Sequence, residues 1–336
     1  MRPGVLDSAL ADAGADAFVF VGPAGDPLVR ALSGAALPCR AAVVYAGRVA
    51  VVPERPLPDY VTVHEDARVL DPVSTPAERL PDLVGDSVLA PRVLPHDAAL
   101  YLENAGVDVA STDAHLRASE CKTDWELAAL RDAQAAAEDG MAAAAAVLAT
   151  AAGDQSDVTA ERVRRTANAA MADAGADPEI VVAADGSIAP SDAVPVRVAP
   201  RVDGYHGWLA RTFVPDSDGG WERRATLAGQ YAVDAGIDIV DVGETTVAAA
   251  AEEVTAELGS YGFPPTAGTG TVHGVGLERR ERPTGEDVIE AGAALAVRAE
   301  LDAEQTVWVA DLAVATEEGV ERVGSFPRSV VPKPDY

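Results

Sequence analysis

Two of the chain's five histidines, His206 and His273, lie in its second half, where the candidate residues for acid–base chemistry occur. Its 336 residues include five histidines and two cysteines. His273 opens a glycine-rich stretch, HGVGLERRERP (residues 273–283), that also carries Glu281. A histidine oriented by a carboxylate can act as a general base. The residual catalytic candidates are therefore His273, with Glu281 or Asp311 orienting it, although a structural role for each of the three stays open.

Arginines form the second group with a chemical meaning. Arginine keeps its charge at any working pH, so clustered arginines must either bind an anion or pair with carboxylates. The carboxylates available for pairing are Glu278, Glu281, Glu300 and Asp311. Both outcomes stay open. We expect Arg197, Arg279, Arg280 and Arg298 to line a common pocket beside Arg211. The candidate substrate- or anion-binding residues are Arg197, Trp208, Arg211, Arg280 and Arg298.

Other catalytic motifs are missing from the sequence. It contains no Gly-X-Ser-X-Gly elbow, phosphate-cradling loop, HEXXH or paired CXXC. The glycine-rich string GTGTVHGVG (residues 268–276) lacks the strand–helix setting and the spacing of a dinucleotide site. Cys39 and Cys121 lie far apart, which argues against a disulfide framework or a cysteine metal site.

The charge balance limits the partners. Acidic residues outnumber basic ones 54 to 26, for a net charge of -28. This excludes nucleic acid and anionic membranes as partners, because the positive charge that drives such binding is lacking. Lysine occurs only at Lys122 and Lys333, and this acid-rich, lysine-poor composition is typical of proteins from high-salt cells. The sequence has no signal peptide pattern and no long apolar run, so we expect a cytoplasmic protein without a membrane span.

The pattern of elements predicts two domains, residues 1–118 and 119–336. In the first, apolar runs at 17–22, 41–52, 60–65 and 67–72 predict strands, with a turn at Ala46-Gly47 and helices over 27–32 and 97–106. This is a small α/β domain. A long helix is expected to start near Asp124, because Thr123 and Glu126 form a capping box. Further helices over 160–174 and 246–258, with strands between and after them, predict a second α/β unit.

Three stretches carry a resemblance to a known family. They are PRVDGYHGWLARTF (200–213), HGVGLERRERP (273–283) and VADLAVATEEG (309–319). They resemble the pita-bread peptidases, which include Xaa-Pro aminopeptidases, prolidases, methionine aminopeptidases and creatinase. The resemblance implies an α/β (α+β) fold in which a creatinase-type domain precedes a pita-bread domain with a curved, mostly antiparallel sheet. It also implies a homodimer.

The same resemblance implies a centre of two Mn, Co or Zn ions held by two Asp, one His and two Glu. The five ligand positions fall here at Arg197, Trp208, His273, Arg298 and Ala310, so four of the five ligands are replaced. Glu300 could take the place of one of them. A dication about 4 Å from a guanidinium costs about 8 kcal/mol at an effective dielectric of about 20. We therefore expect no metal cofactor, and Trp208 to fill the space.

Three functions remain open. The first is a pseudopeptidase that binds a peptide, a small anion or a protein partner. The second is a metal-independent hydrolase of a C–N bond, acting through His273. Creatinase uses the histidine of a Pro-His pair as its catalytic base. That pair corresponds here to Pro190-Ser191, so the second histidine is missing. The third is an active Xaa-Pro metallopeptidase, which would need ligands that the sequence lacks.

Overall fold

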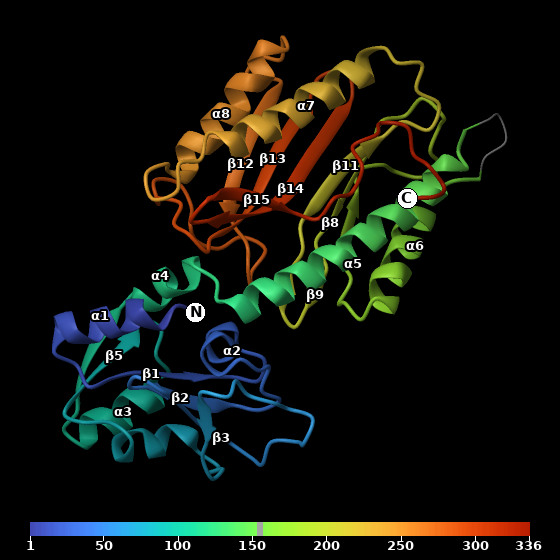
Figure 1. Cartoon of the computed structure of the whole chain (residues 1–336). Coiled ribbons are helices and arrows are strands. Elements are labelled where there is room, and N and C mark those ends of the chain that lie inside the picture. The colour runs from blue at the N-terminus through green and yellow to red at the C-terminus, as the bar shows by residue number, and fades with distance from the viewer. Residues whose placement is uncertain (153–156) are drawn as a thin grey trace. The chain divides into compact units, whose positions relative to one another are not determined.

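A computed structural model describes residues 1–152 and 157–336. The chain forms two compact units, Met1–Thr123 and Asp124–Tyr336 (Figure 1). The sequence pattern predicts this division after residue 118, whereas the second unit begins with the long helix α5 (Asp124–Ala149). Among the described residues, no helix combines the length and the apolar character that a membrane crossing requires.

The first unit is built on six strands: β1 (Ala17–Gly22), β2 (Ala41–Tyr45), β3 (Val49–Pro53), β4 (Ala67–Val69), β5 (Ser87–Pro91) and β6 (Asp108–Thr112). Their order in the sheet is β4-β3-β2-β1-β5-β6. β1 pairs antiparallel with β2 and parallel with β5, so the sheet is mixed. All residues of β1 are buried, which explains why its sequence is a continuous apolar run.

Five helices accompany this sheet: α1 (Pro3–Ala13), α2 (Pro27–Ser33), the 3-10 helix η1 (Pro76–Asp82), α3 (His96–Asn104) and α4 (Ala114–Glu120). The sequence predicts α2 and α3 to within two residues but neither α1 nor α4. α2 begins sharply because Asp26 accepts hydrogen bonds from the backbone N–H groups of Leu28 and Val29 and Pro27 occupies the first turn.

Two local predictions for the first unit have different outcomes. The turn at Ala46-Gly47 is confirmed: Gly47 has φ 73°, and the N–H of Ala46 donates to the carbonyl of Arg48 over 3.1 Å. The strand predicted over 60–65 is wrong. This segment pairs with no strand, and Tyr60 is 80% exposed. Alternation predicts a strand only where a sheet edge is available to pair with it, and none reaches this segment.

The second unit contains an antiparallel seven-stranded sheet: β7 (Ile180–Val182), β8 (Val194–Val198), β11 (Leu209–Phe213), β12 (Gly268–Gly274), β13 (Ala294–Asp302), β14 (Thr306–Thr316) and β15 (Gly319–Val323). The strand order is β12-β13-β14-β11-β8-β7. β13 occupies one edge of β14, so β11 and β15 share the other edge, at Ala310 and at Leu312–Thr316 respectively. The sheet therefore forks, with β11 and β15 as its two branches. A short hairpin, β9 (Arg201–Val202) and β10 (Tyr205–His206), precedes β11.

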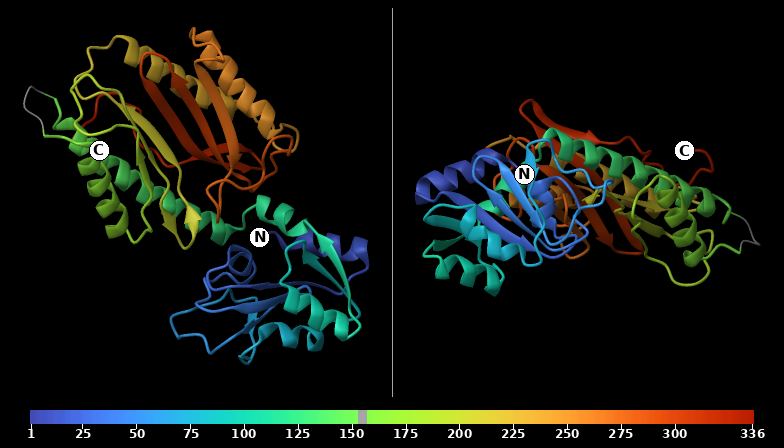
Figure 2. Two further views of the ribbon diagram at one scale, coloured as in Figure 1. Left: turned by 180° about the vertical axis from the view of Figure 1, so that it is seen from behind. Right: turned by 90° about the horizontal axis from the view of Figure 1, so that it is seen from below.

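Two helix pairs cover one face of this sheet (Figures 1 and 2). α5 and α6 (Ala160–Asp173) pack on β8 and β11, whereas α7 (Trp221–Asp238) and α8 (Val247–Ser260) pack on β12, β13 and β14. The apolar side chains that meet the helices, such as Val196, Val297 and Val309, alternate along their strands with residues of the opposite face. The fold class expected from the sequence is confirmed.

Helix α7 is not among the helices predicted from the sequence. Its sequence contains Gly229 and Gly236, which disfavour a helix in isolation. Both glycines serve close packing: a Cβ at Gly236 would lie 2.3 Å from Val254 of α8, and one at Gly229 would lie 2.9 Å from Val309 of β14. Tertiary contacts therefore stabilise this helix more than intrinsic propensity does.

Candidate functional site

A row of residues crosses the second sheet on the face opposite α7 and α8. Arg197 lies opposite Ala210, Ala210 opposite Ala310, Ala310 opposite Arg298, and Arg298 opposite Thr271. Directly opposite residues in a sheet project from the same face. The register therefore brings the two arginines, from β8 and β13, onto one surface with two alanines between them.

Trp208 and His273 share this face. Trp208 precedes Ala210 by two residues and His273 follows Thr271 by two, and side chains two residues apart along a strand point the same way. The two rings meet edge to face, with their centroids 5.2 Å apart. The five positions singled out in the sequence, Arg197, Trp208, His273, Arg298 and Ala310, thus lie on one surface.

The indole of Trp208 occupies the middle of this surface. The residue is 5% exposed and belongs to the same buried cluster as Ala210, Ala296 and Ala310, whose small side chains leave room for the ring. Its backbone N–H donates to Oε1 of Gln134 in α5 over 2.9 Å. The guanidinium carbon of Arg197 lies 5.4 Å from the centroid of the Trp208 ring, a distance at which the cation is attracted to the π-system.

His273 is buried, and one of its nitrogens is already used. Nδ1 lies 3.0 Å from the carbonyl oxygen of Gly274, and because a carbonyl only accepts, Nδ1 carries the proton. Burial lowers the pKa of His273, and the positive charges of Arg280, Arg298 and Arg197 lower it further. The hydrogen bond to Gly274 raises this pKa but does not outweigh these effects. The imidazole is therefore neutral at pH 7.

Neither candidate carboxylate orients this ring through Nδ1. The carboxylate of Glu281 accepts from the backbone N–H of Glu278 over 3.1 Å, within the turn that follows β12. Asp311 follows Ala310 in β14 and so projects from the helix-covered face, away from His273. The structure separates Asp311 from His273 by the thickness of the sheet, so Asp311 does not orient the ring as the sequence analysis expects.

Two of the arginines on the site face are paired. Arg298 bonds Glu300, and its guanidinium carbon lies 5.5 Å from the centre of the Trp308 ring, whose Nε1 donates to the same carboxylate over 2.9 Å. Arg279 pairs with Glu179 at 2.5 Å. The sequence identifies Glu300 as a possible partner, since it stands two residues from Arg298 in the same strand. Nothing in the sequence indicates Glu179.

Arg197 has a different environment. It is half-buried, and no carboxylate of the described residues lies within ion-pairing distance of it. Its Nε is buried and has no acceptor within the described ranges. Burial lowers the pKa of Arg197, and the charges of Arg298 and Arg279 lower it further. Arg280, the remaining candidate, is exposed on the turn after β12. The site face therefore carries positive charge that the neighbouring carboxylates do not neutralise.

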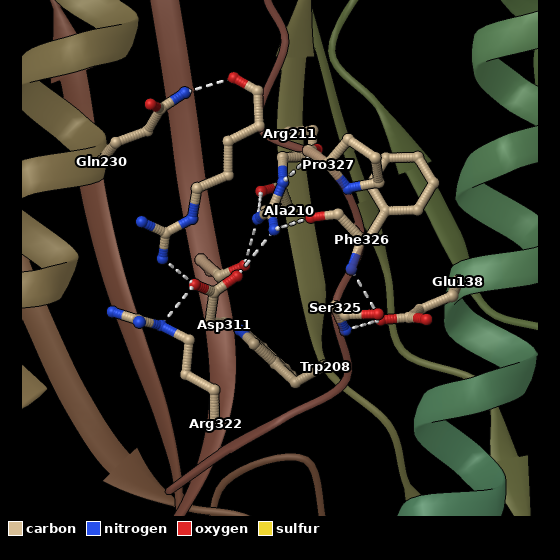
Figure 3. Close-up of polar contacts among 12 residues, drawn as sticks. Glu138, Trp208, Ala210, Arg211, Gln230, Asp311, Arg322, Ser325, Phe326 and Pro327 are labelled. Atoms are coloured by element: carbon tan, nitrogen blue, oxygen red, sulfur yellow. Dashed lines mark hydrogen bonds and ion pairs between the residues drawn. The ribbon is translucent and has the colours of Figure 1, made fainter. Parts of the chain in front are cut away.

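Arg211 does not belong to this face. It lies opposite Val196 and projects among the helices, into the fork between β11 and β15 (Figure 3). There it donates to the carbonyls of Ala210 and Ala310 over 2.9 and 2.8 Å and to Asp311 over 2.8 Å. The prediction that Arg211 lines one pocket with Arg197 is therefore corrected, because adjacent residues of a strand point to opposite faces.

Asp311 is the centre of this second cluster. Besides Arg211, it forms ion pairs with Arg322 at 3.2 Å and with Arg328. Arg328 also pairs with Asp234 of α7 at 2.7 Å. Burial raises the pKa of Asp311, but the charges and hydrogen bonds of Arg211 and Arg328 outweigh it and lower the pKa to about 2. A cavity of about 170 Å³ adjoins the cluster. Asp311 and Asp234 hold these three arginines in ion pairs, so the cluster holds the fork together.

Comparison with known proteins places this geometry in a family. Residues 123–317 match the profile of Metallopeptidase family M24. The chain belongs to this family. A search of the curated proteins finds no match.

Solved structures of family M24 and related enzymes have the same fold as the chain. An Xaa-Pro dipeptidase from Bacillus anthracis superposes with a TM-score of 0.79 at 17% identity over 98% of each chain. The prolidase from Pyrococcus horikoshii OT3 superposes with a TM-score of 0.76 at 17% identity, covering 98% of this chain and 99% of the prolidase. The dipeptidase PepE from Mycobacterium ulcerans superposes with a TM-score of 0.73 at 21% identity, covering 98% of this chain and 96% of the dipeptidase. At these identities the likeness establishes the fold.

The residues on the site face do not fit the two-metal centre that the pita-bread resemblance implies. Arg197, Trp208, Arg298 and Ala310 offer no atom that binds a divalent cation. Glu300, the one alternative ligand that the sequence offers, is bound by Arg298 and Trp308. Across residues 1–152 and 157–336, no three His, Cys, Asp or Glu side chains stand close enough to hold one ion.

Proposed function

We propose that this M24 protein is a pseudopeptidase: it keeps the family fold and uses the site face to bind an anionic ligand without metal. The observation that carries the proposal is Arg197, a half-buried arginine without a carboxylate partner within the described residues. It shares with Arg298 the surface where the resemblance implies metal ligands. A cation in this position favours a bound anion and disfavours a bound metal ion.

A hydrolase that works without metal is the second candidate, favoured by the buried His273 on the same surface. Such a base needs an acceptor nitrogen next to the substrate and a group that orients the ring. The neutral ring provides the acceptor at Nε2. The orienting group is the Gly274 carbonyl, which stabilises an imidazolium less than a carboxylate does. An active Xaa-Pro metallopeptidase is the third candidate and has the least support.

Elemental analysis distinguishes these candidates. We expect the protein, incubated with manganese or cobalt and desalted, to retain close to zero ions per chain, while a prolidase treated in parallel retains its metal. We also expect no release of proline from Xaa-Pro dipeptides. Proline release abolished by a chelator would restore the metallopeptidase, whereas release insensitive to chelators would favour the second candidate. Replacement of His273 by Ala should abolish release in that second case.

The oligomeric state is a separate expectation. By analogy with two-domain pita-bread proteins we propose a homodimer. Light scattering after gel filtration should then give about twice the 34.5 kDa of one chain. A mass equal to that of one chain at all concentrations would refute it.

A further inference from the structure

Two side chains in contact on the site face each carry a buried N–H donor that has no acceptor among the described residues. Nε of Arg197 and Nε1 of Trp208 are both buried, and neither has a hydrogen-bond partner in the described parts of the chain. Other donors nearby are satisfied: the backbone N–H of Trp208 by Gln134 and Nε1 of Trp308 by Glu300. Buried polar groups in native proteins nearly always have partners, so two orphans at one place indicate a missing acceptor.

The guanidinium of Arg197 and the indole of Trp208 are in contact, which brings these donors to one locality. The guanidinium carbon lies 5.4 Å from the centre of the indole. Trp208 is 5% exposed and held by packing and by its backbone hydrogen bond, so its N–H cannot turn out to solvent without losing the packing. An acceptor must therefore come to the donors.

The charges on this face limit what that acceptor is. Arg298 and Arg279 each have a glutamate partner, Glu300 and Glu179, at ion-pair distance. Arg197 is half-buried, and its positive charge is not neutralised by a carboxylate of the described residues. Its ligand therefore needs one negative charge. A carboxylate supplies one charge and two oxygens in a plane, which suits one guanidinium and one indole donor. A phosphate would bring up to two charges and more oxygens than there are unpaired donors.

We propose that the ligand of this face is a carboxylate, with oxygens that accept from Nε of Arg197 and Nε1 of Trp208. This rests on the proposed function, since a metal centre would leave no place for it. The carboxylate has two possible sources, a small carboxylic acid or the C-terminus of a peptide, and both present the same group to the two donors.

The indole N–H of Trp208 reports directly on this contact. The chain has four tryptophans, so protein labelled with ¹⁵N-tryptophan gives at most four indole signals, and the variant Trp208→Phe identifies the relevant one. We expect this signal to shift saturably with N-acetylalanine at constant ionic strength. N-acetylalanine amide, which lacks the charge, should cause no shift. The dipeptide Ala-Ala and its C-terminal amide form the second pair of probes and identify a peptide source if the dipeptide binds more tightly.

Variants test the two donors separately. Arg197→Gln should abolish the saturable shift, whereas Arg165→Gln, a matched change at an exposed arginine of α6, should leave the affinity within about twofold. Trp208→Phe keeps an aromatic ring and removes the N–H, and calorimetry should then show N-acetylalanine binding about tenfold weaker or more. If Arg197→Gln does not fold by circular dichroism, Arg197→Lys keeps the charge without the Nε donor and should also bind about tenfold more weakly.

Several results would overturn the proposal. They are equal shifts with acid and amide, no shift with any carboxylate, or unchanged affinity in both Arg197→Lys and Trp208→Phe. A saturable shift with inorganic phosphate but not with carboxylates would overturn the carboxylate while leaving metal-free anion binding in place. Conversely, hydrolysis of the dipeptide during the titration, with a Trp208 shift that Arg197→Gln removes, would overturn the pseudopeptidase and retain the carboxylate contact.

Discussion

Replacement of Asp311 by Asn tests whether the fork between β11 and β15 depends on a buried charge. Asp311 is 5% exposed and receives Arg211 at 2.8 Å, Arg322 at 3.2 Å and Arg328. The change keeps the size of the side chain and removes the charge. Arg211, 4% exposed, then stays buried without its carboxylate.

The expected loss follows from the pKa. Binding to the arginines lowers the pKa of Asp311 from 3.8 to about 2, which at 1.36 kcal/mol per unit is about 2 kcal/mol. Removing one partner of a buried ion pair costs about 3–5 kcal/mol, because the other charge is left uncompensated. We therefore expect Asp311→Asn to lower the free energy of unfolding at pH 7 by about 3 kcal/mol.

Urea unfolding followed by circular dichroism measures this loss without changing the ionic strength. Asp234→Asn is the matched control: Asp234 pairs with Arg322 and Arg328, but its side chain is 32% exposed, so its loss should stay below about 1 kcal/mol. A loss below about 1 kcal/mol for Asp311→Asn would refute the buried-charge reasoning.

The pH dependence provides an independent check. The pKa of Asp311 is lower in the folded chain than its ordinary value, so the ionised carboxylate contributes its full stabilisation above that ordinary value. The contribution disappears as the pH falls from about 4 to about 2. The difference in stability between the wild type and Asp311→Asn should narrow over this range. A constant difference would contradict the pKa of Asp311.

Three further predictions concern packing and charge. Trp208→Ala should lower the free energy of unfolding by about 3–5 kcal/mol, because the indole fills the space above three alanines; a loss below about 1 kcal/mol in urea would show that the ring is not packed. Gly274→Ala should cost about 1–3 kcal/mol or more, since its Cβ would lie 2.2 Å from the carbonyl oxygen of Arg282. Gly259→Ala, whose Cβ would meet nothing within 4 Å in α8, is the control and should stabilise by about 0.5–1 kcal/mol; equal effects of the two changes would contradict the packing at Gly274. Because the chain carries a net charge of -28, the urea midpoint should rise with potassium chloride concentration as self-repulsion is screened, and a midpoint independent of salt would refute this.

Local signals account for the parts of the fold that could be predicted from the sequence. Asp26 and Pro27 mark the start of α2, and the glycine at position 47 marks a hairpin turn, because each depends on backbone geometry within a few residues. α7 could not be predicted in this way, since its glycines reflect contacts with Val254 and Val309 that lie far along the chain. The strand predicted over 60–65 was wrong for the converse reason. The alternation of its residues is a local signal, but a strand also needs a neighbouring strand with which to pair.

The sequence by itself determined the family resemblance, the two α/β units and the types of residue on the site face. The resemblance to the family motifs was enough to assign Arg197, Trp208 and Arg298 to positions where the family is expected to carry metal ligands. Only the tertiary structure decided which charges meet. It separated Arg211 and Asp311 from that face and paired Arg298 with Glu300. Among the described residues, it left the Nε of Arg197 without an acceptor beside Trp208. The reason is that side-chain pairing depends on strand register and on crossovers between distant segments, and these arise only when the whole sheet forms.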